Sequence, residues 1–456
     1  MRAEIHKRGN TGACSYCGGE EKTFSIGEMA DVIKTALHEH YYHTPSEPDE
    51  FEYAMQKHTD YDWEREGYPI VDVIADCADI TSKCAEDIRS VLAERYSDTE
   101  ESQWDEEDPF DEDAYYAERS VDHAESQASW RRFEESLTTE SRYFNQVAQA
   151  TLASVFEGLG QHKTADGKPV IVEAGPNTQL TAFYRARVFQ SHDKLEEALK
   201  RPDQEIGPPP PFAAISGRMN PHGIAVFYGA LDPAIAIAEV RPPVGSKVVV
   251  GRFDLIRMVR LLDLEALKSV NVEGSIFDPE HIGRLERAKF LNWLSDEITQ
   301  PVMPNDEPFG YLATQAIADF LATVAEPSLD GILYSSVQGS VPNMNVVLFH
   351  KASRLEGLDI PEGTDISATL TRSTEEGEEI DYSVFERVPQ VVADQQPTFV
   401  AGIPLTMNAS GPPEYDSRET TLRLVVESLE VHHITGVTFQ SEQHHVDRYR
   451  YEKDKL

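Results

Sequence analysis

One glutamate stands out in an apolar helix that the sequence predicts within residues 216–241. Asp232 and Pro233 form a strong helix start, with the aspartate as N-cap and the proline as the first helical residue. Residues 234–240 are apolar except at Glu239. A carboxylate in an apolar setting loses solvation, which is costly unless a partner or a chemical role compensates for it. Glu239 is therefore the first candidate for a catalytic residue.

Two arginines precede this helix on a predicted strand. Residues 182–189 alternate as a strand does, which places Arg185 and Arg187 on one face. Neighbouring guanidinium groups suit a diphosphate, because each can donate two parallel hydrogen bonds to an anion. A solvated strand face explains the same pattern equally well.

A pair of cysteines near the N-terminus, Cys14-x-x-Cys17, is the kind of knuckle that holds zinc, which needs four ligands. Cys77 and Cys84 fall in a predicted helix over residues 70–96, where they would share a face and could complete an all-cysteine site. Alternatively, Cys77 and Cys84 are small core residues and the N-terminal pair stays reduced. The sequence leaves structural zinc open.

The surrounding chain predicts how these residues are positioned. With 456 residues, it is long enough for two or three domains. We expect a helical, acidic N-terminal domain over residues 1–165, whose acidic run at 98–113 forms a solvated loop or docks a basic partner. Residues 178–355 mix strands with single helices, which is typical of an α+β domain with a mixed sheet. Residues 356–456 contain short strand-like pieces and predict a small β-rich extension.

Composition excludes several classes of protein. The formal net charge of −39 repels nucleic-acid backbones. No apolar run is long enough to cross a bilayer, and the N-terminus lacks the hydrophobic stretch of a secretory signal. We therefore expect a cytoplasmic protein that binds neither nucleic acid nor membranes. The glycine-rich and nucleophile-elbow fingerprints of common nucleotide-binding proteins and hydrolases are absent.

Four blocks between residues 183 and 349 resemble the RES domain, which is named for its Arg, Glu and Ser. They read FYRAR from residue 183, GRMNPHGIAVFYGALDPAIAIAEV from residue 217, DGILYSS from residue 330 and NVVLF from residue 345. Met219 stands where many members carry Trp, and Ser335 stands where a Pro often precedes the serine. The acidic helical region with its CSYCG start resembles the HEPN-like module found in front of some RES domains.

The resemblance implies an enzyme that degrades NAD. RES proteins are toxins of bacterial toxin–antitoxin pairs, and their fold is similar to that of ADP-ribosyltransferases. Some members split the nicotinamide–ribose bond with phosphate as acceptor, so NAD would be the substrate and phosphate the co-substrate. The expected partner is an antitoxin protein, and a homo-oligomer stays open. The family's catalytic residues fall on Arg185, Tyr228, Glu239 and Ser336.

The resemblance also suggests a role for each group. Glu239 would stabilise the oxocarbenium-like ribose that forms as the bond breaks. Tyr228 can stack on nicotinamide, and Ser336 can hydrogen-bond the phosphate or the carboxamide, although core packing and a strand-end turn are their plain alternatives. The expected contacts to the diphosphate or the phosphate come from Arg185, Arg187, Arg218 and Asn220.

Two other functions remain open. HEPN domains often cut RNA with an R-x(4–6)-H motif, but only three residues separate Arg119 from His123, and the acidic surroundings oppose RNA binding. A protein ADP-ribosyltransferase would attach ADP-ribose to a target protein. Enzymes of that class often carry a second glutamate two residues before the catalytic one, where this chain has Ile237. The sequence therefore favours an NAD phosphorylase or glycohydrolase.

Overall fold

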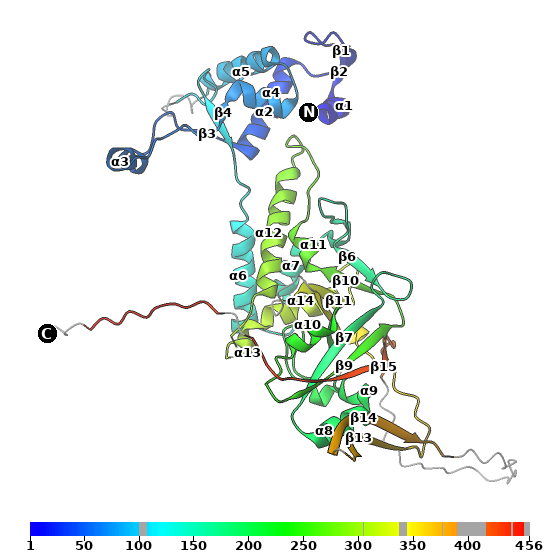
Figure 1. The fold of residues 1–456 in the computed structure, drawn as a ribbon. Coiled ribbons are helices and arrows are strands. Elements are labelled where there is room, and N and C mark those ends of the chain that lie inside the picture. Colours follow the sequence, from blue (N-terminus) through cyan, green and yellow to red (C-terminus); the bar gives the residue numbers. More distant parts are fainter. Residues whose placement is uncertain are drawn as a thin grey trace. The chain divides into compact units, whose positions relative to one another are not determined.

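The computed structural model describes residues 1–99, 107–303, 305–336, 344–375, 377–389, 416–438 and 441–450 (Figure 1). The chain forms two compact units, which are described separately. The first comprises Met1–Glu157, Gln161–Pro169 and Ala266–Gln300, and the second comprises Gly158–Gly160, Val170–Glu265 and Pro301–Leu456. The segment 266–300 thus belongs to the first unit although it lies within the range expected for the RES domain. The predicted acidic loop at 98–113 and the predicted β-rich extension at 356–456 fall partly outside the described residues.

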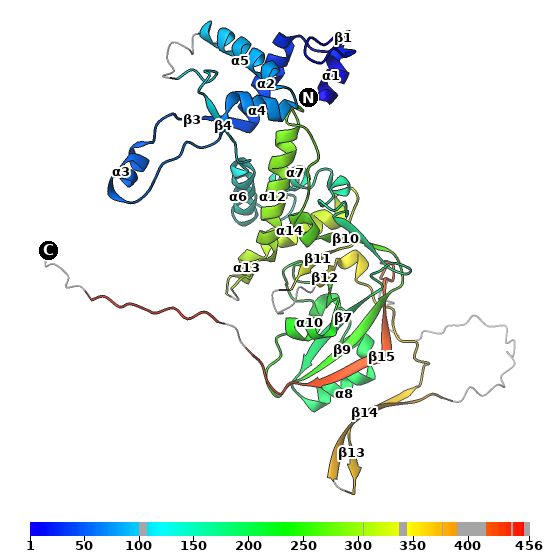
Figure 2. The ribbon, with the colours of Figure 1, turned by 45° about the horizontal axis from the view of Figure 1, so that its top comes forward.

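The first unit is mainly helical. It contains α1 (Arg2–Arg8), β1 (Asn10–Ala13), β2 (Glu20–Thr23), α2 (Ile26–His40), β3 (Tyr41–Thr44), α3 (Glu50–His58), β4 (Tyr68–Pro69), α4 (Ile70–Ala78), α5 (Ser82–Ser97), β5 (Tyr115–Glu118), α6 (Ala124–Thr139), α7 (Gln146–Val155) and α12 (His281–Thr299). Helices α2, α4 and α5 bury one apolar cluster, which Phe277 joins from the segment 266–300. Figures 1 and 2 both show α6 beside α12, where the rings of Trp130 and Phe290 lie 6.1 Å apart.

Residues 70–96 form two helices, so the prediction of one helix is wrong. Asp79 ends α4 in the left-handed conformation, with φ 54° and ψ 54°. The Ile80 N–H then donates back to the Ala75 carbonyl oxygen at 3.0 Å, which closes the helix end. The side chain of Thr81 accepts from the Cys84 N–H and starts α5. Two local caps in succession therefore override the helical periodicity.

The second unit is built on a mixed sheet. Its elements are β6 (Ile171–Ala174), β7 (Ala182–Phe189), α8 (His192–Lys200), α9 (Pro202–Glu205), β8 (Phe227–Ala230), α10 (Pro233–Glu239), β9 (Lys247–Leu255), β10 (Val259–Asp263), α13 (Glu307–Gly310), α14 (Leu312–Thr323), β11 (Gly331–Ser335), β12 (Met344–Leu348), β13 (Asp365–Thr374), β14 (Gly377–Arg387) and β15 (Leu422–His433). The short helix α11 (Leu264–Lys268) spans the boundary between the units. The eight strands run in the order β15-β9-β7-β8-β12-β11-β10-β6. All pairs in this sheet are antiparallel except β10 with β11.

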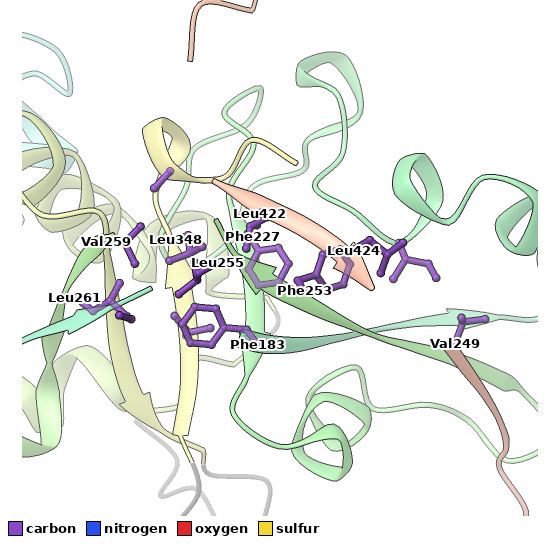
Figure 3. Close-up of a cluster of buried hydrophobic side chains, with 14 of the residues drawn as sticks. Phe183, Phe227, Val249, Phe253, Leu255, Val259, Leu261, Leu348, Leu422 and Leu424 are labelled. Atoms are coloured by element: carbon purple, nitrogen blue, oxygen red, sulfur yellow. The ribbon is translucent and has the colours of Figure 1, made fainter. Parts of the chain in front are cut away.

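The sheet buries apolar side chains on both faces. One face carries Phe183, Phe227 and Phe253 (Figure 3). Helix α8 packs over this face through Leu195, Ala198 and Leu199. The other face carries Ala186 and the even-numbered valines of β9, and Ile235 and Ala236 of α10 pack on it. An α+β fold with a mixed sheet behind a helical N-terminal region is therefore confirmed. Among the described residues, no helix is long and apolar enough to cross a membrane.

The C-terminal part contributes an edge strand to this sheet. β15 pairs with β9 in an antiparallel ladder from Leu422 to His433, with an irregularity between Val425 and Glu430. Leu422 and Leu424 pack in the same cluster as Phe183. β13 and β14 form a separate two-stranded sheet. The end of the chain thus completes the core of the second unit.

We expect Leu422→Ala to lower the free energy of unfolding by about 2–5 kcal/mol, because it leaves a cavity beside a fully buried side chain. Equilibrium unfolding in urea measures the change. The control is Val426→Ala on the same strand, whose side chain is 41% exposed and should change stability by less than about 0.5 kcal/mol. Equal effects of the two substitutions would show that β15 is not part of the core.

Candidate active site

The site begins where the ladder between β7 and β8 stops. These neighbouring strands pair only at Tyr184 and Ala230, whereas β7 pairs with β9 along its whole length and β8 pairs with β12. Beyond that position, Nη1 of Arg185 donates to the carbonyl oxygen of Tyr228 at 3.0 Å. A continuing ladder would satisfy this carbonyl with a backbone N–H. The arginine side chain therefore takes over where the strands diverge.

Side chains on both faces of the sheet are connected through Tyr228 at this point. By strand alternation, Arg185 shares its face with Phe183, and its Cζ lies 5.5 Å from the centre of the Phe227 ring. The side chain of Tyr228 lies on the opposite face, which α10 covers. The Tyr228 backbone carbonyl thus links the arginine to the residues on the α10 face.

Arg185 is a cation without a partner anion in the described part of the chain. Its side chain is partly buried, and Nε is sealed from solvent without a hydrogen-bond partner. Burial, followed by repulsion from Arg187, lowers the pKa of Arg185 to about 10. The group still carries its charge at neutral pH. A buried charge without a counter-ion is costly, so this guanidinium is a candidate anion-binding group.

Arg187, the second arginine of the strand, is engaged elsewhere. Its Nη1 donates to the carbonyl oxygen of Glu205 and lies 3.4 Å from the carboxylate of the same residue. Arg187 is exposed, and its Cζ lies 6.0 Å from the centre of the Phe189 ring. Arg187 adds positive charge near Arg185, but its guanidinium group already forms a hydrogen bond with Glu205 of α9.

Tyr228 holds the turn that precedes its strand. Its hydroxyl donates to Oδ1 of Asn220 at 2.9 Å and accepts from the Met219 N–H at 3.0 Å. The amide nitrogen of Asn220 donates to the carbonyl oxygens of Ile215 and Ile224, both at 2.9 Å. The amide of Asn220 is thus used inside the protein, which makes it a positioning group for the turn. Burial raises the pKa of Tyr228 to about 12, so its hydroxyl stays protonated at neutral pH.

Helix α14 supports the same turn from the other side. Nε2 of Gln315 donates to the carbonyl oxygens of Gly217 and Asn220, at 2.9 and 3.1 Å. The hydroxyl of Thr314 donates to the carbonyl oxygen of Arg218 at 2.5 Å. Cζ of Arg218 lies 5.5 Å from the centre of the Tyr311 ring. The backbone that presents Arg218 is therefore fixed by three hydrogen bonds from one helix.

Glu239 is the last residue of α10, and its side chain is exposed. The expectation that it sits in an apolar environment is wrong, because Glu239 is exposed at the end of the helix while Ile235 and Ala236 pack on the sheet. Its Oε2 accepts a hydrogen bond from Nδ2 of Asn345 at 3.0 Å. Asp232 caps the start of this helix as predicted, accepting from the Ala234 N–H at 2.8 Å. The helix therefore presents an accessible carboxylate.

Tyr334 connects these groups. Burial raises the pKa of its hydroxyl, and the negative charge of Glu239 and the proximity of Tyr228 raise it further, while Arg218 opposes the shift. Glu239, Tyr228 and Arg218 therefore all act electrostatically on one hydroxyl. Ser336 follows directly on β11, two residues beyond Tyr334, and is partly buried. The structure thus brings Tyr228, Glu239 and Arg218 near one another at the ends of β8, β11 and β12. Arg185 reaches this group only through the Tyr228 carbonyl, and Arg187 is held by Glu205.

Sequence reasoning missed four polar groups that hold the site: Gln315, Thr314, Tyr334 and Asn345. A signal existed for some of them. Asn345 interrupts the apolar strand MNVVL, and Thr314 and Gln315 form a polar pair in the apolar helix LATQAIADFLAT. Nothing in the sequence indicates which polar groups such residues contact, because their partners lie far away along the chain.

The four cysteines do not form the all-cysteine metal site that the sequence left open. Cys77 lies on α4 and Cys84 on α5, and the left-handed Asp79 between them breaks the shared face. Cys14, Cys17 and Cys84 line a cavity of about 750 Å³ in the first unit, and Cys77 is not part of that lining. Within the described ranges, no group of three or more His, Cys, Asp or Glu is placed to hold a metal ion.

Comparison with protein families agrees with this architecture. The chain matches the RES domain over residues 183–371 and the HEPN/RES N-terminal domain 1 over residues 7–151. These two matches confirm the predicted order, in which a RES domain follows a HEPN/RES N-terminal domain. No curated protein and no solved structure matches the chain.

The two domains support a toxin-type, NAD-related function in general terms. The RES domain also suggests an enzyme, and it is consistent with NAD as its substrate. The RES match begins at Phe183 on β7 and includes all the site residues described above.

Gly217 offers a test of the turn. A Cβ at this position would lie 2.7 Å from both the Tyr228 hydroxyl and Oδ1 of Asn220. We expect Gly217→Ala to break this hydrogen bond and to lower the free energy of unfolding by about 1–3 kcal/mol. The control is Gly357→Ala, because a Cβ there would meet nothing within 4 Å. Urea unfolding of both variants measures the two free energies. If Gly217→Ala left the free energy of unfolding unchanged, the turn would be loosely held.

Proposed function

We propose that the RES domain breaks the nicotinamide–ribose bond of NAD, with phosphate as the acceptor. The observation that supports this most directly is the guanidinium of Arg185 at the divergence of β7 and β8, which has no partner anion among the residues that the structure describes. Both the diphosphate of NAD and a free phosphate are anions that this group can bind. An exposed carboxylate, Glu239, lies near Tyr228 and Tyr334 on the adjoining face.

The reaction needs little acid–base chemistry. The bond between ribose C1′ and the pyridinium nitrogen breaks, and its electron pair neutralises that nitrogen, so nicotinamide leaves without a proton donor. The ribose carbon passes through an oxocarbenium-like state, which a fixed carboxylate stabilises. A phosphate oxygen then bonds to C1′ and gives a phosphorylated ADP-ribose. The exposure of Glu239 suits this role, because the carboxylate is accessible to the substrate.

The remaining residues bind and orient the substrate. Arg185 binds the diphosphate or the incoming phosphate, and Arg218 assists from the turn that α14 supports. Arg187 contributes positive charge although its fork is held by Glu205. Tyr228 packs against nicotinamide while its protonated hydroxyl keeps the turn in place. Ser336, at the end of β11, hydrogen-bonds the phosphate or the carboxamide.

The biological context we propose is a toxin with an antitoxin partner. A chain with a formal net charge of −39 favours a basic partner. We expect the protein from its native host to co-purify with a small basic protein at low ionic strength and to separate from it as salt rises. Recovery of a lone and fully active enzyme from that host would contradict this expectation.

The first experiment follows nicotinamide and the ribose product from NAD, with and without phosphate. Release that requires phosphate and yields phosphorylated ADP-ribose establishes the phosphorylase. Release without phosphate, giving ADP-ribose, identifies a glycohydrolase at the same site. Transfer of label from NAD to protein would indicate an ADP-ribosyltransferase instead.

Glu239→Gln tests the carboxylate. The substitution keeps the shape and removes the charge that stabilises the cation, so we expect kcat to fall by about 10²–10³-fold with little change in the binding of NAD. Because the side chain is exposed, the free energy of unfolding should change by less than about 0.5 kcal/mol. A folded variant with full turnover would move the chemistry to another residue.

A further inference from the structure

Asn345 is a polar residue in the core of the second unit. It lies on β12, between the apolar neighbours of the strand MNVVL, and is only 1% exposed. The ladders place it opposite Ala230 of β8 on one side and opposite Tyr334 of β11 on the other. Its side chain therefore lies on the α10 face of the sheet, together with Tyr228.

The orientation of its amide is fixed by charge. Nδ2 lies 3.0 Å from Oε2 of Glu239, and only the N–H side of the amide can donate to a carboxylate. Oδ1 is buried without a hydrogen-bond partner among the described residues. Flipping the amide would place its oxygen against the carboxylate, which is repulsive. The protein thus keeps an unsatisfied buried oxygen in order to present the N–H to Glu239.

Glu239 needs such a partner. It is the last residue of α10, its side chain is exposed, and the backbone carbonyls at a helix C-terminus disfavour a negative charge. A long exposed side chain occupies many rotamers, whereas transition-state stabilisation requires one position. In the part of the chain that the structure describes, Asn345 donates a hydrogen bond to this carboxylate.

We propose that Asn345 is the positioning residue of the active site: its amide holds one oxygen of Glu239 and leaves the other to face the ribose. This inference rests on the proposed NAD cleavage. It assigns the cost of the unsatisfied Oδ1 to function, because a leucine at this position would fill the same core without leaving a polar atom unpaired.

The decisive variant is Asn345→Leu, a near-isostere without polar atoms. We expect kcat for nicotinamide release to fall on the order of 100-fold, while KM for NAD changes by less than about threefold. The melting temperature should stay the same or rise, because the unsatisfied oxygen is gone. Unchanged kcat, or a loss of kcat that follows a loss of stability, would overturn the proposal.

A second variant covers the case in which leucine does not fold. Asn345→Ala removes the amide and its hydrogen bond to Glu239, so kcat should fall by a similar factor while KM for NAD changes little. Stability should fall as well, because the substitution leaves a cavity at a buried position. A folded Asn345→Ala variant with full kcat would equally overturn the proposal.

Two controls separate the explanations. Ser353→Ala removes another polar side chain that is 1% exposed in the same unit, and it should lower stability while keeping kcat. In the Glu239→Gln background, Asn345→Leu should reduce kcat little further, because its partner is already lost. If the unaltered protein releases no nicotinamide, the proposed function fails. If it does and Asn345→Leu is fully active, only the positioning role fails.

Discussion

The unpaired charge of Arg185 is the constraint on which the site depends. A guanidinium between two strands, with its Nε sealed from solvent and without a carboxylate among its described contacts, is unfavourable in a folded protein. The sheet can accommodate this arginine because β7 and β8 each pair with another strand and need few hydrogen bonds to one another. β7 is anchored along its full length by β9, and β8 is anchored by β12, so the ladder between them can stop after Tyr184. Completion of that ladder would satisfy the Tyr228 carbonyl from the backbone and remove this hydrogen bond of the arginine.

Tyr228 couples the two faces of the sheet at this point. Its backbone carbonyl accepts a hydrogen bond from Arg185. Its hydroxyl forms hydrogen bonds with Asn220 and Met219 in the turn that carries Arg218. Gln315 and Thr314 of α14 hold the opposite side of that turn. The turn is therefore held between a strand and a helix, which restricts where the Arg218 guanidinium can lie. Such restriction is what a site needs if it is to bind a phosphate in one orientation.

The sequence predicted the elements near the site better than their environments. Residues 182–189 form β7 with the expected bounds, and Asp232 and Pro233 start α10 as predicted. These features are local, because alternation and caps depend on neighbouring residues. The setting of Glu239 could not be predicted in this way. The apolar residues of α10 face the sheet, and the exposure of Glu239 depends on where that helix ends.

The sequence-based predictions were wrong or incomplete where the structure depends on distant residues or on competing local signals. The helix predicted over residues 70–96 is broken by Asp79 in the left-handed conformation, a state that periodicity does not detect. Asn345 was missed because its importance depends on Glu239, more than a hundred residues earlier in the chain. A polar residue inside a strand indicates that some partner exists, but the register of β8, β12 and β11 decides which one.

The overall charge and the local site act in opposite directions on an anionic substrate. A net charge of −39 repels both NAD and phosphate at long range. At physiological ionic strength, screening limits this repulsion to about 8 Å, so most acidic residues affect the encounter rate and not the bound state. Arg185 acts within a poorly solvated site, where its charge is screened much less. Among the described residues Arg185 has no carboxylate partner, so its charge stays available to an anion in an otherwise acidic protein.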